Sequence, residues 1–172
     1  MNHNKKFLAP LPLASQHDSS LFDCGIEPLN TYLKRYALQN HKNGSAKSYV
    51  VLKDHQIVAY YSLSYGSVAC EEPPVRISKG LGRYPIPVMV LARLAVDKNE
   101  KGKGLGEGLL RDALLKTLEA SEIAGLRAVL VHAKDENVKQ FYLKYGFEPS
   151  PIQEYQLFLL LKDLKKASLL SK

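Results

Sequence analysis

A glycine-rich stretch between a short apolar run and an amphipathic segment constrains the fold of this chain more than any other feature. The apolar run covers residues 91–96, and glycines then alternate through residues 101–106. Beyond them, apolar residues recur at helical spacing, with charged residues largely on the opposite side. A strand, a glycine turn and a helix N-terminus together form an anion site, because the first-turn N–H groups lack partners inside the helix and the helix dipole favours negative charge. The stretch therefore predicts a phosphate-binding loop.

Three phosphate-binding motifs are candidates for this loop. The dinucleotide pattern G-x-G-x-x-G fails at its last glycine, which would fall on Glu107 or Leu109. The P-loop pattern needs Ser or Thr after its lysine, and Gly104 stands there. The remaining pattern, R/Q-x-x-G-x-G/A, is filled by Lys101, Gly104 and Gly106. It resembles the acyl-CoA pyrophosphate loop of the GNAT acetyltransferases, with Lys in place of the usual Arg or Gln. A glycine-rich turn without chemical meaning is the alternative.

The composition favours one globular domain with a polyanionic partner. At 172 residues the chain is most simply a single domain, predicted over residues 1–172, and 45% hydrophobic residues suffice for a real core. The net charge of +7 suggests nucleic acid before membrane, although a basic surface can also serve solubility alone. No apolar stretch approaches the roughly 18 residues of a spanning helix. The cysteines Cys24 and Cys70 lack metal-ligand spacing, so we expect reduced thiols, no metal site and a cytoplasmic protein.

The N-terminal third is predicted to contain an edge strand, a helix and a hairpin. Residues 7–13 include two prolines and can form only an edge strand or an extended arm. Pro28 fits the first turn of a helix whose apolar stripe includes Tyr32 and Tyr36. Residues 48–67 are rich in Val, Ile and Tyr around a central Asp-His turn, which is typical of a β-hairpin.

The rest of the chain alternates between strands and helices after a long loop. Residues 71–87 hold four prolines and are predicted to be an irregular, functional loop. Residues 127–133 form a continuous apolar run typical of a buried strand. A helix is expected over residues 137–145, ended by Gly146, and a last strand over residues 155–161. The chain then ends in a basic tail, DLKKASLLSK.

A second signature strengthens the resemblance to the GNAT family. Residues 137–147, NVKQFYLKYGF, are similar to the family's Asn, Phe-Tyr and Gly-Phe pattern, and they follow the glycine loop in the family's order. The order of predicted strands and helices is also that of the family. The resemblance implies the GNAT fold, an α/β (α+β) architecture with a mixed, mostly antiparallel sheet flanked by helices.

Further segments resemble a narrower group, the GNAT toxins of type II toxin–antitoxin modules. They are FDCG and LNTYL near the N-terminus, then GSAKSYVV, GRYPIPV, LARLAVD and FYLKYGFEPSP. The resemblance implies transfer of acetyl from acetyl-CoA to the α-amine of aminoacyl-tRNA, which stops translation. It also implies a homodimer, a ribbon–helix–helix antitoxin, and contact with operator DNA only through that antitoxin. A tRNA substrate agrees with the net charge of +7.

The same resemblance implies roles for individual residues. Tyr142 matches the family's general acid, and a phenol of pKa about 10 is protonated at neutral pH; the alternative is a core aromatic on an amphipathic helix. Asn137 matches a residue near the pantetheine, and its alternative role is a helix N-cap. The implied cofactor contacts are Leu94, Ala95, Val96, Lys101, Gly102, Lys103, Gly104, Leu105, Gly106, Asn137 and Phe141.

The basic residues are the candidates for RNA contacts. No acidic residue occurs between Glu72 and Asp97, a region with several cations. Phosphate contacts dominate nucleic-acid affinity, so this pattern favours RNA binding, although each charge alone could be a solvated surface residue. The predicted set is Arg76, Lys79, Arg83 and Arg93, with Lys34 and Arg35 as a second patch; Arg93 could instead have a structural role within its strand.

No general base is evident from the sequence. The α-amine of an aminoacyl ester has a pKa near or below about 7.7 to 8.0, whereas a lysine side chain, at about 10.4, would need a base. This difference favours the α-amine. Two rival functions stay open: a protein N-terminal or small-molecule amine acetyltransferase, and a non-catalytic module that acts through its antitoxin on DNA.

Overall fold

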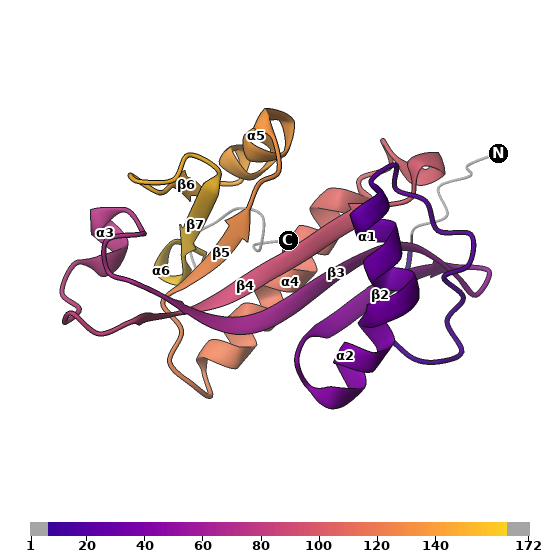
Figure 1. Cartoon of the computed structure of the whole chain (residues 1–172), viewed down its shortest axis with the longest axis horizontal. Coiled ribbons are helices and arrows are strands. Elements are labelled where there is room, and N and C mark those ends of the chain that lie inside the picture. The colour runs from indigo at the N-terminus through magenta and orange to yellow at the C-terminus, as the bar shows by residue number, and fades with distance from the viewer. Residues whose placement is uncertain (1–6, 165–172) are drawn as a thin grey trace. The chain divides into compact units, whose positions relative to one another are not determined.

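The computed structural model describes residues 7–164, which form a seven-stranded sheet with helices (Figure 1). The strand order is β1-β2-β3-β4-β5-β7-β6. The pairs β1–β2, β2–β3, β5–β7 and β6–β7 are antiparallel and β4–β5 is parallel, which confirms the predicted mixed, mostly antiparallel sheet. The strands are β1 (Leu11–Pro12), β2 (Lys47–Lys53), β3 (Gln56–Val68), β4 (Ile86–Val96), β5 (Ala128–His132), β6 (Glu148–Pro149) and β7 (Gln156–Leu160).

Helical segments lie between the strands. They are α1 (Glu27–Thr31), the π-helix η1 (Tyr32–Tyr36), α2 (Ala37–Asn43), α3 (Val75–Ser78), the 3₁₀ helix η2 (Lys98–Glu100), α4 (Leu105–Ser121), α5 (Glu136–Lys144) and α6 (Leu161–Leu164). In the described part of the chain, no helix is both long and apolar enough to cross a membrane.

The chain divides into two compact units, each with its own hydrophobic core. Unit 1 comprises the chain up to Leu63 together with Arg93–Asp112, and unit 2 comprises Ser64–Ala92 and the chain from Ala113 onward. The elements β3, β4 and α4 contribute residues to both units. The division therefore does not separate two independent stretches of sequence, and a single domain over residues 1–172 stays a prediction.

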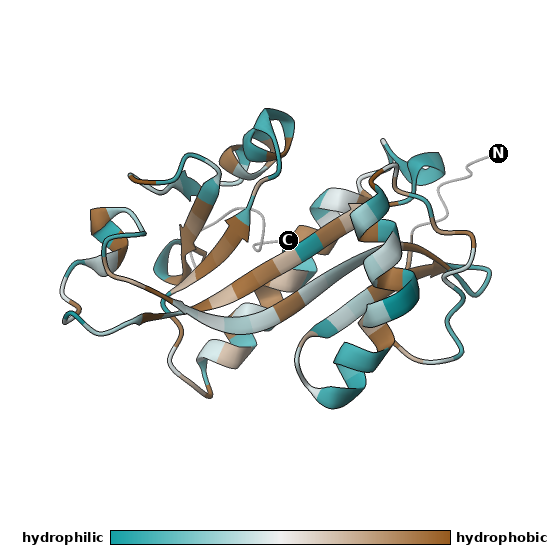
Figure 2. Cartoon of the chain, viewed as in Figure 1, coloured by the Kyte–Doolittle hydropathy of each residue, from teal (hydrophilic) through white to brown (hydrophobic). Residues whose placement is uncertain are grey.

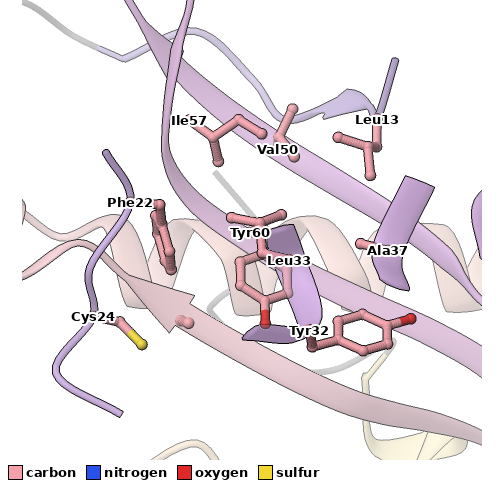
Figure 3. Packing of buried hydrophobic residues seen from close by; sticks show 10 residues of the cluster. Leu13, Phe22, Cys24, Tyr32, Leu33, Ala37, Val50, Ile57 and Tyr60 are labelled. Atoms are coloured by element: carbon pink, nitrogen blue, oxygen red, sulfur yellow. The ribbon is translucent and has the colours of Figure 1, made fainter. Parts of the chain in front are cut away.

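Two consecutive tyrosines of β3 in unit 1 are wholly buried, and Tyr60 belongs to the hydrophobic core of that unit. The Tyr60 ring packs edge-on against Phe22, at 5.6 Å between centroids, and stacks with Tyr32 at 6.5 Å (Figure 3). The hydroxyl of Tyr61 instead donates to a carboxylate oxygen of Asp112 on α4, at 2.5 Å. Since successive side chains of a strand point to opposite faces, helical segments cover both faces of β3 in this unit.

The first helical region departs from the predicted stripe. Tyr32 and Leu33 are both buried, but Tyr36 is 52% exposed, so its predicted place in the apolar stripe is wrong. The reason is the π-turn of η1, which holds an extra residue and shifts the register of the side chains that follow it. Lys34 and Arg35 are exposed, as predicted.

The edge strand and the hairpin of unit 1 are confirmed. Leu11 of β1 pairs with Val50 of β2, at the edge of the sheet. The turn between β2 and β3 places Asp54 at φ 51° and His55 at φ 67°. Two consecutive residues of positive φ are the mark of a tight hairpin turn whose twist matches the flanking strands.

In unit 2, β5 and β7 form the apolar centre, and both are almost wholly hydrophobic in Figure 2. Their buried residues share a core cluster with Ile77 and Ile86. Both isoleucines fall in the segment predicted to be an irregular loop. That prediction is wrong at these points: residues 75–78 form α3, and β4 begins at Ile86 rather than at residue 91. Burial of the two side chains in the core determines the local structure there, despite the prolines.

The last predicted elements are confirmed. β5, α5 and β7 match the predicted ranges to within one residue at each end, and Gly146, at φ 94°, follows the end of α5. The basic tail begins within α6, and its remainder lies outside the described residues.

Candidate active site

The glycine loop joins η2 to α4, and its backbone conformation requires glycine at two positions. Gly102 and Gly104 both have φ of 81°, which L side chains rarely adopt. A Cβ built at either position would meet no atom within 4 Å, so conformation rather than space requires the glycines. The 17-residue helix α4 starts directly after Gly104, and the N–H groups of its first turn have no partner inside the helix. The loop therefore offers backbone donors and a helix dipole to an anion.

A pocket of about 290 Å³ lies at this loop, within unit 1. One wall is the end of β4, a second is the loop with the start of α4, and a third is the segment leading into α1. Every predicted cofactor residue between positions 94 and 106 lines the pocket, except Lys103. The walls comprise, in that order, Leu94, Ala95 and Val96; Glu100, Lys101, Gly102, Gly104, Leu105 and Gly106; and Cys24, Ile26 and Leu29.

Sequence reasoning missed the third wall and one acidic residue of the second. Cys24, Ile26 and Leu29 lie some seventy residues before the glycine loop, and no local pattern indicates that they meet it. In the sequence, the FDCG stretch stands out only as part of the resemblance to the GNAT toxins. No sequence pattern indicates that Glu100 lines the pocket. A carboxylate is not expected beside a phosphate site, because it is unfavourable there unless cations neutralise it.

Two lysines neutralise Glu100. The carboxylate is buried and accepts hydrogen bonds from the ammonium of Lys103, at 2.6 Å, and of Lys53, at 2.9 Å. These two bonds, led by the one from Lys103, lower the pKa of Glu100, so the carboxyl is ionised at neutral pH. Lys103, predicted to contact the cofactor, therefore has its ammonium bound to Glu100 in this structure.

Polar contacts tie the segment before α1 to the glycine loop. The amide of Asp23 donates to a carboxylate oxygen of Asp97 at 3.0 Å, and the ammonium of Lys98 lies 3.0 Å from a carboxylate oxygen of Asp23. The ammonium of Lys101 donates to the carbonyl oxygen of Cys24 at 3.3 Å. The loop and the third wall of the pocket thus form one connected structure.

In unit 2, α5 carries the other predicted residues. The carboxylate of Asp135 accepts a hydrogen bond from the amide of Val138, at 2.9 Å, and caps the helix. The N-cap role considered for Asn137 is therefore wrong; Asn137 lies in the first turn and is exposed. Its predicted contact with the pantetheine is compatible with that exposure and stays a prediction.

Tyr142 is buried in a cluster of aromatic rings. It is 6% exposed, and its ring packs edge-on against Phe141 and Phe147, at 5.1 and 5.2 Å between centroids. The left-handed Gly146 ends the helix and lets Phe147 turn back onto Tyr142. Burial raises the pKa of Tyr142, so the phenol keeps its proton at neutral pH. A core aromatic and a proton donor are therefore compatible roles for this side chain.

The predicted RNA contacts have different environments. In unit 2, the Arg76 guanidinium pairs with Glu148, at 2.8 Å, and with Asp163. In unit 1, the Arg93 guanidinium lies 3.4 Å above the centroid of the Tyr32 ring, next to the π-helix. The others are exposed: Lys79 and Arg83 follow α3, and Lys34 and Arg35 lie on η1.

Residues 44–149 match the Acetyltransferase (GNAT) domain. This chain belongs to the GNAT acetyltransferase family. A curated relative from Mycobacterium tuberculosis, a tRNA-acetylating toxin, is 40% identical over 159 residues, which cover 92% of this GNAT chain and 95% of the relative.

Two solved GNAT structures are also similar along nearly the whole chain. One is the toxin AtaT complexed with acetyl-methionyl-tRNAfMet, with a TM-score of 0.85 and 27% identity, covering 92% of this chain and 97% of that one. The other is a tyrosine-to-phenylalanine variant of AtaT bound to the C-terminus of the antitoxin AtaR and acetyl-CoA. It has a TM-score of 0.78 and 26% identity, covering 92% of this chain and 96% of that one.

The residues of the pocket fit acetyl-CoA, the acyl donor of GNAT enzymes. The glycine loop offers amides to the pyrophosphate, and the side of the pocket formed by β4 and α1 is apolar, as the pantetheine and acetyl groups require. Glu100 also lines the pocket, but its negative charge is balanced by Lys53 and Lys103, and Lys101 adds a further positive charge. The site can therefore hold a donor that carries several negative charges.

Proposed function

We propose that this GNAT protein is a toxin that transfers the acetyl group of acetyl-CoA to the α-amine of aminoacyl-tRNA and thereby blocks translation. The observation that carries the proposal is the 40% identity to the tRNA-acetylating toxin of Mycobacterium tuberculosis. This identity covers 92% of the chain and so extends well outside the GNAT match at residues 44–149. The complex of AtaT with acetyl-methionyl-tRNAfMet and the net charge of +7 support the same substrate.

In this proposal the backbone of unit 1 binds and polarises the donor. Acetyl-CoA supplies an activated thioester. The amides of residues 102–106 bind its pyrophosphate, and the backbone of β4 at residues 94–96 pairs with its extended arm as an added strand would. An N–H group of the same strand end donates to the thioester carbonyl and stabilises the negative charge that develops there.

Tyr142 acts as the general acid. Its hydroxyl donates a proton to the sulfur that leaves, and the raised pKa of the phenol keeps that proton in place until it is needed. The attacking α-amine has a pKa near or below about 7.7 to 8.0, so a substantial fraction is neutral without a dedicated base. As the C–N bond forms and the C–S bond breaks, the nitrogen releases one proton to water, and the Tyr142 phenolate then regains a proton from solvent. Asn137 and Phe141 complete the contacts to the donor from α5.

The proposal includes the partners of such a toxin. The protein is a cytoplasmic homodimer with one GNAT domain per chain, and an antitoxin with a ribbon–helix–helix domain neutralises it. The AtaT complex with the C-terminus of AtaR supports an antitoxin partner. Contact with operator DNA occurs only through that antitoxin.

The decisive experiment incubates the purified protein with labelled acetyl-CoA and a bulk pool of charged tRNA. Label in the RNA fraction that requires charging is the expected result, and sorting by isoacceptor then identifies the amino acid. Uncharged tRNA is the control. Acetyl-CoA binding without label in RNA would contradict the proposal and favour a protein N-terminus or a small-molecule amine as the acceptor.

A further inference from the structure

Residues 79–85 of unit 2, here called the RYP loop, present an aromatic ring to solvent. All seven residues are exposed. Tyr84 is 83% exposed, the most of any tyrosine in the described part of the chain; the next, Tyr65, is 67% exposed. Among the residues that the structure describes, no ring or cation stacks on Tyr84. An aromatic ring with so little burial contributes little to the fold, and nearly its whole surface is available to a partner outside the chain.

The RYP loop is anchored at its base. The Arg127 guanidinium donates to the carbonyl oxygen of Ile77 at 2.8 Å and to that of Lys79 at 3.5 Å. Ile77 itself is wholly buried in the core of unit 2. These bonds fix the start of the loop to Arg127, the residue directly before β5, so the loop projects from the core of unit 2.

Glycine within the RYP loop makes room for the ring. A Cβ at Gly82 would lie only 3.3 Å from the Tyr84 ring, closer than ordinary van der Waals contact. The ring therefore rests beside the glycine backbone while most of its surface faces solvent.

The charge around Tyr84 suits a polyanion. Residues 73–96 contain no acidic residue, and Arg83 is adjacent to Tyr84. Arg76 is neutralised by Glu148 and Asp163, but Lys79 and Arg83 form no ion pair with any residue of the described segment. Proteins bind unpaired nucleotides with exposed aromatic rings and nearby cations that form no ion pair. The bases stack on the rings, and the cations bind the phosphates.

We infer that Tyr84 stacks on an unpaired base of the acceptor end of the tRNA, with Lys79 and Arg83 at the neighbouring phosphates. The inference rests on the proposed function and adds a substrate-binding residue to it. Stacking on a tyrosine is tolerant of base identity, so Tyr84 would anchor the shared single-stranded end of tRNAs rather than select the amino acid.

The test compares three substitutions at Tyr84 by the KM for aminoacyl-tRNA and the KM for acetyl-CoA. Tyr84→Phe keeps the aromatic face, Tyr84→Leu keeps an apolar side chain without it, and Tyr84→Ala removes both. We expect Leu and Ala to raise the KM for aminoacyl-tRNA by about fivefold or more, which corresponds to the loss of one stacked base, with the KM for acetyl-CoA unchanged. Phe should stay close to the wild type. Tyr155→Ala, at another exposed tyrosine of unit 2, is the matched control and should change neither constant.

Filter binding of tRNA and the oligomeric state of each variant complete the test. An unchanged KM for aminoacyl-tRNA in Tyr84→Ala would overturn the inference, as would a variant whose KM rises because a dimer dissociates, since Tyr84 would then be a subunit contact. If the wild type binds tRNA through Tyr84 but transfers no acetyl group to it, the proposed function fails while the RNA contact stands.

Discussion

The glycine loop of unit 1 and the helix α5 of unit 2 carry the two family signatures. The loop offers backbone groups, whereas α5 offers a side chain. In the loop, Gly102 and Gly104 contribute only backbone, and the ammonium of Lys103 is bound to Glu100. In α5 the group that we propose to act is a side chain, the Tyr142 phenol, whose ring packs against Phe141 and Phe147. The loop is specified by conformation and α5 by packing.

This difference determines which substitutions each region tolerates. A backbone site loses function when φ and ψ change, even if the new side chain meets no neighbour. A side-chain site loses function when one atom is removed, even if the packing survives. The predictions below test this contrast, from the largest expected effect to the smallest.

Tyr142→Phe removes a single oxygen and should preserve the aromatic packing of α5. We expect kcat to fall by about 10²- to 10⁴-fold, the usual contribution of a general acid, with acetyl-CoA binding retained. Single-turnover transfer and calorimetric titration with acetyl-CoA measure the two quantities. If the variant inhibits growth as strongly as the wild type while it binds acetyl-CoA, the toxicity is not enzymatic, and a non-catalytic module is the better explanation.

Gly104→Ala tests the backbone side of the comparison. The φ of 81° costs an L residue about 1 to 2 kcal/mol, which destabilises the binding conformation of the loop. The KM for acetyl-CoA should therefore rise by about 5- to 30-fold. Gly108→Ala is the matched control: it lies within α4, its added Cβ also meets no atom within 4 Å, and its φ is not in the left-handed region. It should bind acetyl-CoA normally. Equal effects of the two substitutions would contradict the conformational explanation.

Arg83→Ala and Arg76→Ala extend the contrast to the basic residues. Arg83 forms no ion pair within the described residues, so its loss should weaken tRNA binding. The slope of the logarithm of the binding constant against the logarithm of salt concentration should also decrease in magnitude by about one, the value for one phosphate contact. Arg76 pairs with Glu148 and Asp163, so its loss should affect unfolding more than RNA affinity. Binding at several salt concentrations and urea unfolding separate the two. A larger loss of tRNA affinity in Arg76→Ala would show that its ion pairs open to admit RNA.

Asp23→Asn should change how stability depends on pH. The amide of Gly25 and then the ammonium of Lys98 lower the pKa of Asp23 to about 2. Since the folded-state value lies below the unfolded-state value of about 3.9, the stabilisation is present above pH 4 or so and is lost as the pH falls toward about 2. Urea midpoints measured across this range should fall less steeply in the variant than in the wild type. Parallel curves would show that the contacts of Asp23 do not contribute.

Local patterns predicted much of the fold. The hairpin follows from two β-branched and aromatic runs around Asp54-His55, and the loop and α4 follow from glycines before a helical repeat. The end of α5 at Gly146 was equally predictable, because a glycine after an apolar helical run is a standard helix end. The conformation of these segments depends on residues that are close in sequence. The sequence alone therefore determined their secondary structure.

Tertiary structure decided the rest. The π-turn that exposes Tyr36 lets both Tyr32 and Leu33 reach a core formed with β3. The burial of Ile77 makes a helix where prolines predicted a loop. The pocket wall at Cys24, the Lys53 partner of Glu100 and the partners of Arg76 come from distant parts of the chain. Such contacts depend on which elements meet after the chain folds, and periodicity carries information only about neighbours along the chain.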